Sequence, residues 1–471
     1  MSGHGASSDT ALRLADRMRS EAPWELFAER IRRYEVHWNG RRIEMIRGPI
    51  VLEGYAVRLF RSRDSKTGVG FQASTDLSDE GLRTATADAE GLTQYSEFPT
   101  KKVELPSSAP HSTTSVDIRD PGLWDRPAEY LGEYVETLFR AFDGKRDVAP
   151  SFGSVRATLS ETSLANSFGL RTAHADTSID FEIAVKAFGG PEGPPPGEYW
   201  VNDTTRKLEP SQLPEEVEQW CRYARDVRQA TQPPTGDLPV LLPASVSSGI
   251  LPMVMGFQFT GFARLRKIAP DLGRTVGVEG LSVHDDGRVP WAIGSSPVDD
   301  EGTPQRRRTL IAKGAVSELM YDALHAGAFD VPRTGNAVRG MEFGFRDWKR
   351  FLHRPQGTAT TLVIDPGPGG TDVELIEAAG DGVWVQQLGW AMPDTISTAF
   401  GGELRIGYRI RHGKLAEPVR GGTVGGVVLS PPGAPSMLAS IAAIGSTPTL
   451  TNGVQMPTLL IRPLTVAGSG G

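Results

Sequence analysis

Apolar and polar residues alternate along several short runs in the first half of the chain, a pattern that is typical of half-buried strands. The run Tyr34–Trp38 leads directly into Asn39-Gly40, the strongest short signal for a two-residue hairpin turn. Further alternating or apolar runs lie at residues 42–46, 55–60, 69–73, 155–160 and 178–185. Together, these runs predict an antiparallel sheet.

Between these runs, apolar residues recur every three or four positions, which predicts helices. The helices are expected at residues 9–20, around 80–92, at 127–142 and at 213–228. Pro23 is expected to interrupt the first of them, and the acidic stretch 76–80 to cap the second. The N-terminal part is therefore expected to be an antiparallel sheet with packed helices.

A domain boundary is expected at 233–236, where a double proline and a glycine follow the last of these helices. The predicted domains are an N-terminal α+β domain at 1–232, with a possible sub-boundary in the Pro/Ser/Thr-rich linker 105–115, and a C-terminal domain at 236–471. Beyond the boundary the pattern predicts mostly strands, at 238–243, 361–364, 383–388, 403–410, 424–429 and 457–463. The fold class is thus α+β with a β-rich C-terminal domain.

A cluster of charges stands out in the C-terminal half. Asp299, Asp300 and Glu301 lie between turn-forming residues, and the run 306–308 of three arginines follows them. The simplest interpretation is a salt-bridged turn that locks two elements, and the alternative is a loop that faces a substrate or a partner. The three carboxylates suit acid–base chemistry or a hard cation, but neighbouring residues of a strand point to opposite faces, so at most two would converge.

The elements expected around this cluster are a strand at 309–311, a helix at 316–326 and a polar, glycine-centred loop at 334–337. The glycine-rich loop 366–370 has no Lys-Ser/Thr after it, so it is interpreted as an ordinary turn and not as a phosphate site.

Composition narrows the class of protein. A chain of 471 residues is expected to form two or three domains. The net charge of -7 disfavours direct nucleic-acid binding, and the single cysteine, Cys221, excludes an internal disulfide framework. Neither a signal peptide nor an apolar window of membrane-spanning length is found, which predicts a cytoplasmic protein without a membrane anchor. Residues 2–8 are predicted to be a disordered tail, and residues 189–197 are predicted to form a turn-rich loop.

Several motifs carry a resemblance to a known family. They are DDEG-x-P-x-R and TGNA-x-R around the acidic cluster, NS-x-G at 166–169, the run GYAVRLF…GVGFQASTDLSDEGL, and F-x-G-x-x-R-x-G-Y-x-I-x-x-G-K-x-x-x-P-V-R-G-x-T near the C-terminus. Taken in their order along the chain, over about residues 33 to 465, these motifs resemble the TldD/PmbA family of two-subunit metallopeptidases. The resemblance implies a barrel-like C-terminal domain.

The resemblance also implies where zinc chemistry belongs. The catalytic subunit of the family carries H-E-x-x-x-H on a helix close to the strand that opens the C-terminal domain, with a distant Cys or His as a further ligand. The corresponding stretch here, Ala244–Phe262, has no His, Glu or Asp, and no two of the eight histidines lie three to five residues apart. The chain therefore resembles the zinc-free PmbA/TldE-type subunit, with no catalytic residue and no metal of its own.

On this resemblance the chain is expected to line the peptide channel of a complex whose TldD-type partner supplies the zinc. Candidate channel or interface residues are those in loops with family-like motifs: Asn166, Asp299, Asp300, Glu301, Arg308 and Asn336. One alternative is a homo-oligomeric binding protein, or an enzyme whose zinc-independent chemistry uses the acidic loop 299–301. Another is a homologue without activity, in which the apolar run 245–259 has replaced the metal helix.

Overall fold

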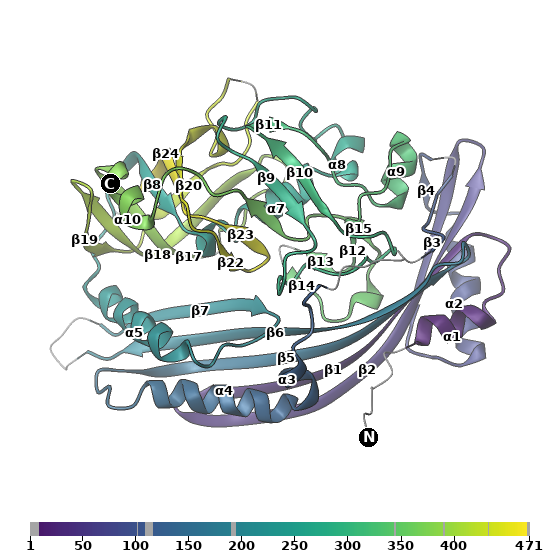
Figure 1. Ribbon diagram of the computed structural model, residues 1–471, viewed down its shortest axis with the longest axis horizontal. Coiled ribbons are helices and arrows are strands. Elements are labelled where there is room, and N and C mark those ends of the chain that lie inside the picture. The colour runs from purple at the N-terminus through teal and green to yellow at the C-terminus, as the bar shows by residue number, and fades with distance from the viewer. Residues whose placement is uncertain are drawn as a thin grey trace.

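The computed structural model describes residues 9–100, 102–108, 116–189, 195–342, 345–389, 391–431 and 433–468. The predicted tail 2–8, most of the linker 105–115 and the centre of the loop 189–197 lie outside these residues. A long curved sheet forms the N-terminal part, and the C-terminal part sits in its concave face (Figure 1). The α+β prediction is confirmed. No helix among the described residues is long and apolar enough to cross a membrane.

The N-terminal sheet is antiparallel, and its strands run in the order β4-β3-β2-β1-β5-β6-β7. The strands are β1 Trp24–Asn39, β2 Arg42–Arg63, β3 Lys66–Ser74, β4 Glu97–Phe98, β5 Val148–Asn166, β6 Arg171–Ala187 and β7 Gly197–Thr205. The predicted hairpin at Asn39-Gly40 is present, with Gly40 at φ +57°. The two runs predicted at 42–46 and 55–60 belong to one continuous strand, β2.

Helices cover the convex face of this sheet. They are α1 Thr10–Arg17, α2 Asp79–Leu92, α3 Pro121–Asp125, α4 Pro127–Ala141 and α5 Leu213–Gln229. Ser78 caps α2 by accepting a hydrogen bond from the Gly81 amide. Apolar residues of α4 and α5 bury Val36, Trp38 and Val155 of the sheet. One face of the sheet is thereby closed by helices, and the other is left to the C-terminal part.

The C-terminal part contains a closed barrel, as the resemblance implied. Its described strands are β8 Gly236–Leu242, β17 Gly382–Gly389, β18 Ala399–Arg411, β20 Thr423–Val427 and β24 Leu459–Ala467, and the pairing of β17 with β18 closes the ring. β19 Lys414–Val419 and β21 Ile441–Ile444 pair with barrel strands from outside it. A second sheet joins β11 Ala315–Val316, β10 Arg307–Ala312, β9 Val283–Asp286, β16 Leu362–Ile364, β23 Val454–Met456 and β22 Thr449–Thr451.

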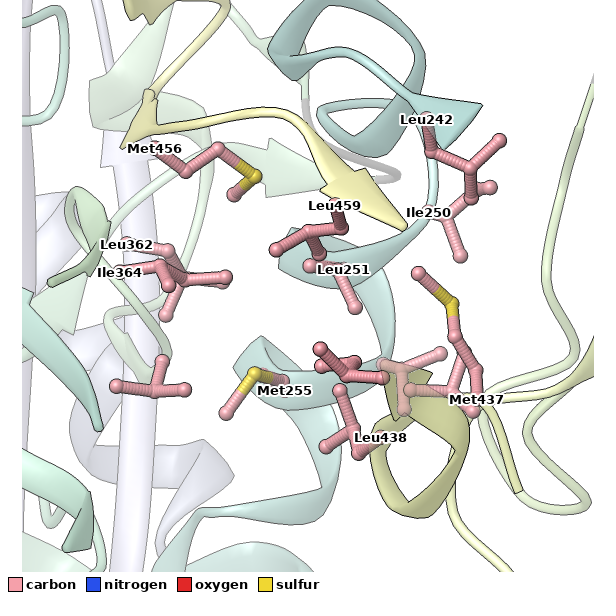
Figure 2. Packing of buried hydrophobic residues seen from close by; sticks show 14 of the residues in the cluster. Leu242, Ile250, Leu251, Met255, Leu362, Ile364, Met437, Leu438, Met456 and Leu459 are labelled. Atoms are coloured by element: carbon pink, nitrogen blue, oxygen red, sulfur yellow. The ribbon is translucent and has the colours of Figure 1, made fainter. Parts of the chain in front are cut away.

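Short helices pack around these sheets: α6 Ala244–Ser247, α7 Leu251–Gln258, α8 Gly261–Leu265, α9 Ala323–Phe329, α10 Asp372–Ala379 and the 3-10 turn η1 Arg350–Leu352. The apolar run predicted at 245–259 forms α6 and α7. Leu251 and Met255 of α7 point into the main C-terminal core, beside Leu459 and Leu438 (Figure 2).

The helix predicted at 316–326 is wrong in its start, because α9 begins only at Ala323. The preceding backbone bonds to other segments: the amide of Ser317 donates to Leu310, and that of Met320 donates to Phe259. Asp322 is the true N-cap, since its side chain accepts a hydrogen bond from the His325 amide. Long-range pairing therefore overrides the helical spacing of the apolar residues.

Candidate functional site at the seam between the two parts

Buried charges fill the seam between the concave face of the sheet and the C-terminal part. We use the term seam for Glu25, Glu29, Arg58, Asp300, Glu301, Arg339 and Arg350, all of which are at least 95% buried. On β1, Glu25 and Glu29 alternate with Leu26 and Ala28, which pack under α1 and α2. The polar face of the strand is therefore covered by protein and not by solvent.

Arg58 of β2 is the centre of the first group of ion pairs. Its Nη2 lies 2.8 Å from Glu25 Oε2 and 2.5 Å from Glu301 Oε1. Arg339 holds the other oxygen of Glu25, with Nη2 to Oε1 at 2.6 Å. Burial alone would lower the pKa of Arg58, but the charges of Glu25 and Glu301 outweigh it and raise that pKa. The guanidinium thus stays charged and ties strand to loop.

Arg350, in η1, makes the second group of ion pairs. Its Nε lies 2.6 Å from Glu29 Oε1, and its backbone amide donates to Glu29 Oε2 at 3.0 Å. Its Nη1 lies 3.3 Å from Asp300 Oδ1, and Nη2 donates to the hydroxyl of Thr162. One arginine thereby fastens η1 and the acidic loop to two strands of the sheet.

Each carboxylate of the acidic loop 299–301 has a fixed set of partners. Asp299 accepts hydrogen bonds from the amides of Glu301, Thr303 and Ala337 at 3.0, 2.8 and 3.0 Å. Asp300 Oδ2 accepts one from the Arg339 amide at 2.7 Å, and Glu301 Oε2 accepts one from the first amide of α9 at 2.7 Å. Burial, with the charge of Glu301, raises the pKa of Asp299 well above its ordinary value.

This geometry is that of the salt-bridged turn predicted from the sequence, although the arginines involved are distant ones. The guanidinium groups of Arg58 and Arg350 pair with the loop, and the backbone amide of Arg339 donates to it. Arg308 instead donates to the Thr334 carbonyl at 2.7 Å and pairs with Glu318 at 2.8 Å. These ion pairs and hydrogen bonds hold the acidic loop in one conformation, so the loop can position the segments that it contacts. Acid–base chemistry would need a carboxyl group that can reach a substrate, and the carboxylates of this loop are buried and bonded.

Two further candidate residues, Asn166 and Asn336, stabilise loops through side-chain hydrogen bonds. Asn166 accepts hydrogen bonds from the amides of Phe168 and Leu170 and donates to the Pro106 carbonyl at 2.8 Å. Asn336 donates to Asp285 Oδ2 at 2.5 Å. All six candidates predicted from the sequence are more than 90% buried. Asp300 and Glu301 belong to the seam, while Asp299 and the other three candidates brace neighbouring loops. The assignment of all six to a peptide channel stays a prediction.

Two small cavities flank the seam. One of about 10 Å³, room for a single water, is lined by residues that include Asp299, Asp300 and Gln305. The other, of about 30 Å³, lies between the concave sheet face and η1, and its lining includes Asp176, Asp180, Trp348 and Arg350. Both abut groups that fix the C-terminal part on the sheet.

Asp285 gives a pH-dependent prediction. Burial outweighs its hydrogen bonds from Thr360, Thr361 and Asn336 and raises its pKa from 3.8 to about 6. The folded state therefore favours the protonated carboxyl, so the stability that Asp285 contributes is greatest below pH 3.8 and is lost as the pH rises through about 6.

We expect the difference in free energy of unfolding between wild type and Asp285→Asn to fall by about 2.5 kcal/mol between about pH 4 and about pH 7. Urea unfolding at several pH values measures it. A pH-independent difference would show that Asp285 is ionised throughout this range.

A family model described as the PmbA/TldA metallopeptidase C-terminal domain matches residues 235–468. The chain belongs to the PmbA/TldD family. The structure of TldE from Thermococcus kodakarensis superposes with a TM-score of 0.77 at 16% identity, covering 97% of this chain and 99% of that one. At this identity the likeness shows the fold.

Curated relatives carry peptidase names. The Metalloprotease TldD homolog of Haemophilus influenzae is 28% identical over 251 residues, which is 51% of this chain and 50% of that protein. Metalloprotease PmbA of Escherichia coli O157:H7 is 22% identical over 413 residues, which is 85% of this chain and 83% of that protein. The match thus spans about half the length of the TldD homolog and most of PmbA.

Helix α7 occupies the place where the zinc helix of a PmbA/TldD-family peptidase is expected, just after strand β8. Pro252, Met253 and Phe257 are its partly exposed side chains, and Leu251, Val254 and Met255 are buried. The partly exposed positions have the i, i+1, i+5 spacing of H-E-x-x-x-H, but they carry no imidazole, carboxylate or thiolate that could bind zinc. Within the described residues, no group of three His, Cys, Asp or Glu side chains is placed to hold a metal ion.

Sequence reasoning missed the basic half of the seam. In the sequence, Arg58 and Arg350 look like ordinary surface arginines. Glu25 and Glu29, likewise, look like ordinary surface carboxylates. The available signal was weak: Glu25, Glu29 and Arg33 recur every four residues on one face of β1, which marks a shared face but does not show that the face is buried.

Proposed function

We propose that this chain is a non-catalytic subunit of a heteromeric, TldD/TldE-like zinc metallopeptidase, and that it completes the peptide channel with a zinc-bearing, TldD-type partner. The observation that carries the proposal is α7. The helix lies close to β8, the strand beside which the resemblance places H-E-x-x-x-H, and its partly exposed side chains Pro252, Met253 and Phe257 have the i, i+1, i+5 spacing of that motif. Zinc needs nitrogen, oxygen or thiolate ligands, and none of these side chains offers one.

Two further observations support the proposal. The fold follows TldE of Thermococcus kodakarensis over nearly its whole length. The seam also locks the acidic loop and η1 onto the sheet through Arg58 and Arg350, so the chain offers a rigid surface to a partner. A rigid surface is what a subunit needs if it is to position a peptide for chemistry carried out by another chain.

The channel would be bordered by the loops that the six candidate residues brace. Asn166, for example, fixes the turn that leaves the ring of Phe168 38% exposed. A binding protein or enzyme that acts alone through the acidic loop finds less support, because all three carboxylates of that loop are buried and bonded.

Co-expression with a TldD-type chain tests the proposal. We expect the two chains to co-purify, and we expect peptide cleavage by the complex to exceed that of either chain alone by about tenfold or more. Cleavage is followed with a mixed peptide substrate by mass spectrometry. If the TldD-type chain cuts at full rate by itself while this chain stays apart, the proposal is wrong.

The double variant Asp300→Asn with Glu301→Gln separates the two functions. For a supporting subunit, peptide cleavage by the assembled complex falls only modestly, provided that assembly persists. If the acidic loop were itself the reactive site, the isolated protein would lose binding or activity altogether.

A further inference from the structure

Two aromatic rings stay on the surface where the chain passes from α7 to α8. Phe262, the second residue of α8, is 39% exposed, and Phe257 of α7 is partly exposed. Their ring centroids lie 5.6 Å apart in an edge-to-face arrangement. The two rings form a small apolar platform, and exposed aromatic side chains that lie together are typical of binding surfaces.

The chain around this platform supplies cations and no carboxylates. From α6 through the turn that ends α8 there is no Asp or Glu, and there are three cations: Arg264, Arg266 and Lys267. Arg264 is turned toward α9 and lies over the ring of Phe329, 4.2 Å from its centroid. The guanidinium carbon of Arg266 instead lies 5.5 Å from the ring centroid of Phe262. Neither Arg266 nor Lys267 has an ion pair in the part of the chain that the structure describes.

Carboxylates on neighbouring segments are already bonded. The ring of Phe262 packs against His325, and Nδ1 of that histidine lies 2.7 Å from Asp322 Oδ2. The side chain of Gln258, at the end of α7, donates to two carbonyls of the next loop. In that loop the carboxylate of Asp394 accepts the backbone amides of residues 396 and 397. The positive charge beside the platform is therefore left for a group outside the chain.

Lys267 ends α8 in a backbone conformation that favours glycine. Its φ is +58°. The amide of Ile268 donates to the Ala263 carbonyl at 2.8 Å and that of Lys267 to the Arg264 carbonyl at 3.0 Å, the two bonds of a Schellman turn. Glycine is usual at this place because a Cβ is strained in the left-handed region. No ion pair of the ammonium group with described residues offsets that strain, so the retained lysine points to a ligand of opposite charge.

The spacing of platform and cations selects the kind of ligand. It must carry an apolar group close to a carboxylate. In an extended peptide, adjacent side chains point to opposite faces, and side chains on the same face are roughly 7 Å apart. The 5.5 Å between the Phe262 ring and the Arg266 guanidinium is shorter than that. A C-terminal residue carries its side chain and its carboxylate on one Cα, so it suits the shorter distance.

We propose that the surface formed by Phe257, Phe262, Arg266 and Lys267 binds the C-terminal residue of a peptide. The apolar side chain of that residue packs on the two rings, and its α-carboxylate pairs with the guanidinium and ammonium groups. A guanidinium that stacks on an aromatic ring still presents its fork of N–H groups to a carboxylate. This inference rests on the proposed function, which supplies the peptide, and it names the end of the peptide that this subunit holds.

Fluorescence anisotropy with the full chain alone tests the carboxylate. The probe is a short, uncharged peptide that ends in leucine and carries fluorescein at its N-terminus, made as the free acid and as the C-terminal amide. We expect the free acid to bind about tenfold or more tightly than the amide. Equal affinities would overturn the proposal, and so would equally tight binding of an amidated peptide with an internal glutamate. The assay contains no TldD-type chain, so its failure leaves the co-expression result standing, and the reverse also holds.

A glycine variant separates binding from a structural role. Lys267→Gly supplies the residue that the turn favours, so we expect a urea midpoint at or above that of wild type and an affinity for the free acid that is about fivefold or more weaker. Lys313→Gly is the matched control, because Lys313 is also exposed and left-handed, with φ +47°, in the turn between β10 and β11; its affinity should equal that of wild type. If Lys267→Gly binds the free acid as wild type does, the proposal is wrong.

Discussion

Replacing Arg58 with methionine is expected to lower the free energy of unfolding by about 3–5 kcal/mol, the range seen when one partner of a buried ion pair is removed. Arg58 is 2% exposed, and its guanidinium bonds both Glu25 and Glu301. Without it, Glu301 keeps a buried carboxylate that has lost its cation. Urea unfolding followed by tryptophan fluorescence measures the change.

Two control variants make this result specific. Arg61→Met lies on the same strand, but its partner Glu90 and its own side chain are about half exposed, so we expect a loss below about 1 kcal/mol. Adding Glu301→Gln to Arg58→Met should recover part of the stability, because no unpaired charge is then left at that position. Equal losses from Arg58→Met and Arg61→Met would show that the seam does not hold the two parts together.

Replacing Arg206 with methionine is expected to have an effect of similar size, about 3–5 kcal/mol, through a different set of bonds. Arg206 is 1% exposed and donates to the carbonyls of Ile118, Thr177, Ala292, Ile293 and Ser295 and to Asp176. The loss of this side chain removes one donor from each of these backbone carbonyls. It also frees the 292–295 loop, which leads into the acidic loop.

Thermal unfolding and limited proteolysis together identify this effect. We expect a lower melting temperature in Arg206→Met and new cleavage near residues 292–295 under native conditions. Arg405→Met serves as the control, because Arg405 is 52% exposed and pairs with an equally exposed Glu403. If Arg206→Met is cut no faster than wild type at that loop, the arginine does not anchor it.

Local patterns were sufficient for much of the fold. Asn39-Gly40 placed the first hairpin, and apolar spacing placed α2, α4 and α5, because each depends on neighbours close in sequence. The helix expected at 316–326 failed where the amide of Met320 bonds to Phe259 instead of to its own turn. Long-range backbone pairing of this kind leaves no local signal.

Only the acidic loop of the seam could be predicted from the sequence. The acidic loop was visible as three adjacent carboxylates between turn formers, and its role as a salt-bridged turn followed from that composition. Its partners were not visible, because Arg58 and Arg350 come from segments hundreds of residues apart and meet only when the C-terminal part covers the sheet. The alternation of side chains along a strand places Glu25 and Glu29 on one face of β1, but only the tertiary structure shows that this face is buried.

Zinc content tests the central claim most directly: that chemistry in the assembly belongs to a partner and not to this chain. Metal analysis of the purified chain, and of its complex with a TldD-type subunit, is the measurement. We predict less than about 0.1 zinc per chain for the protein alone and about one zinc per complex. About one tightly bound zinc in the isolated chain would contradict the account.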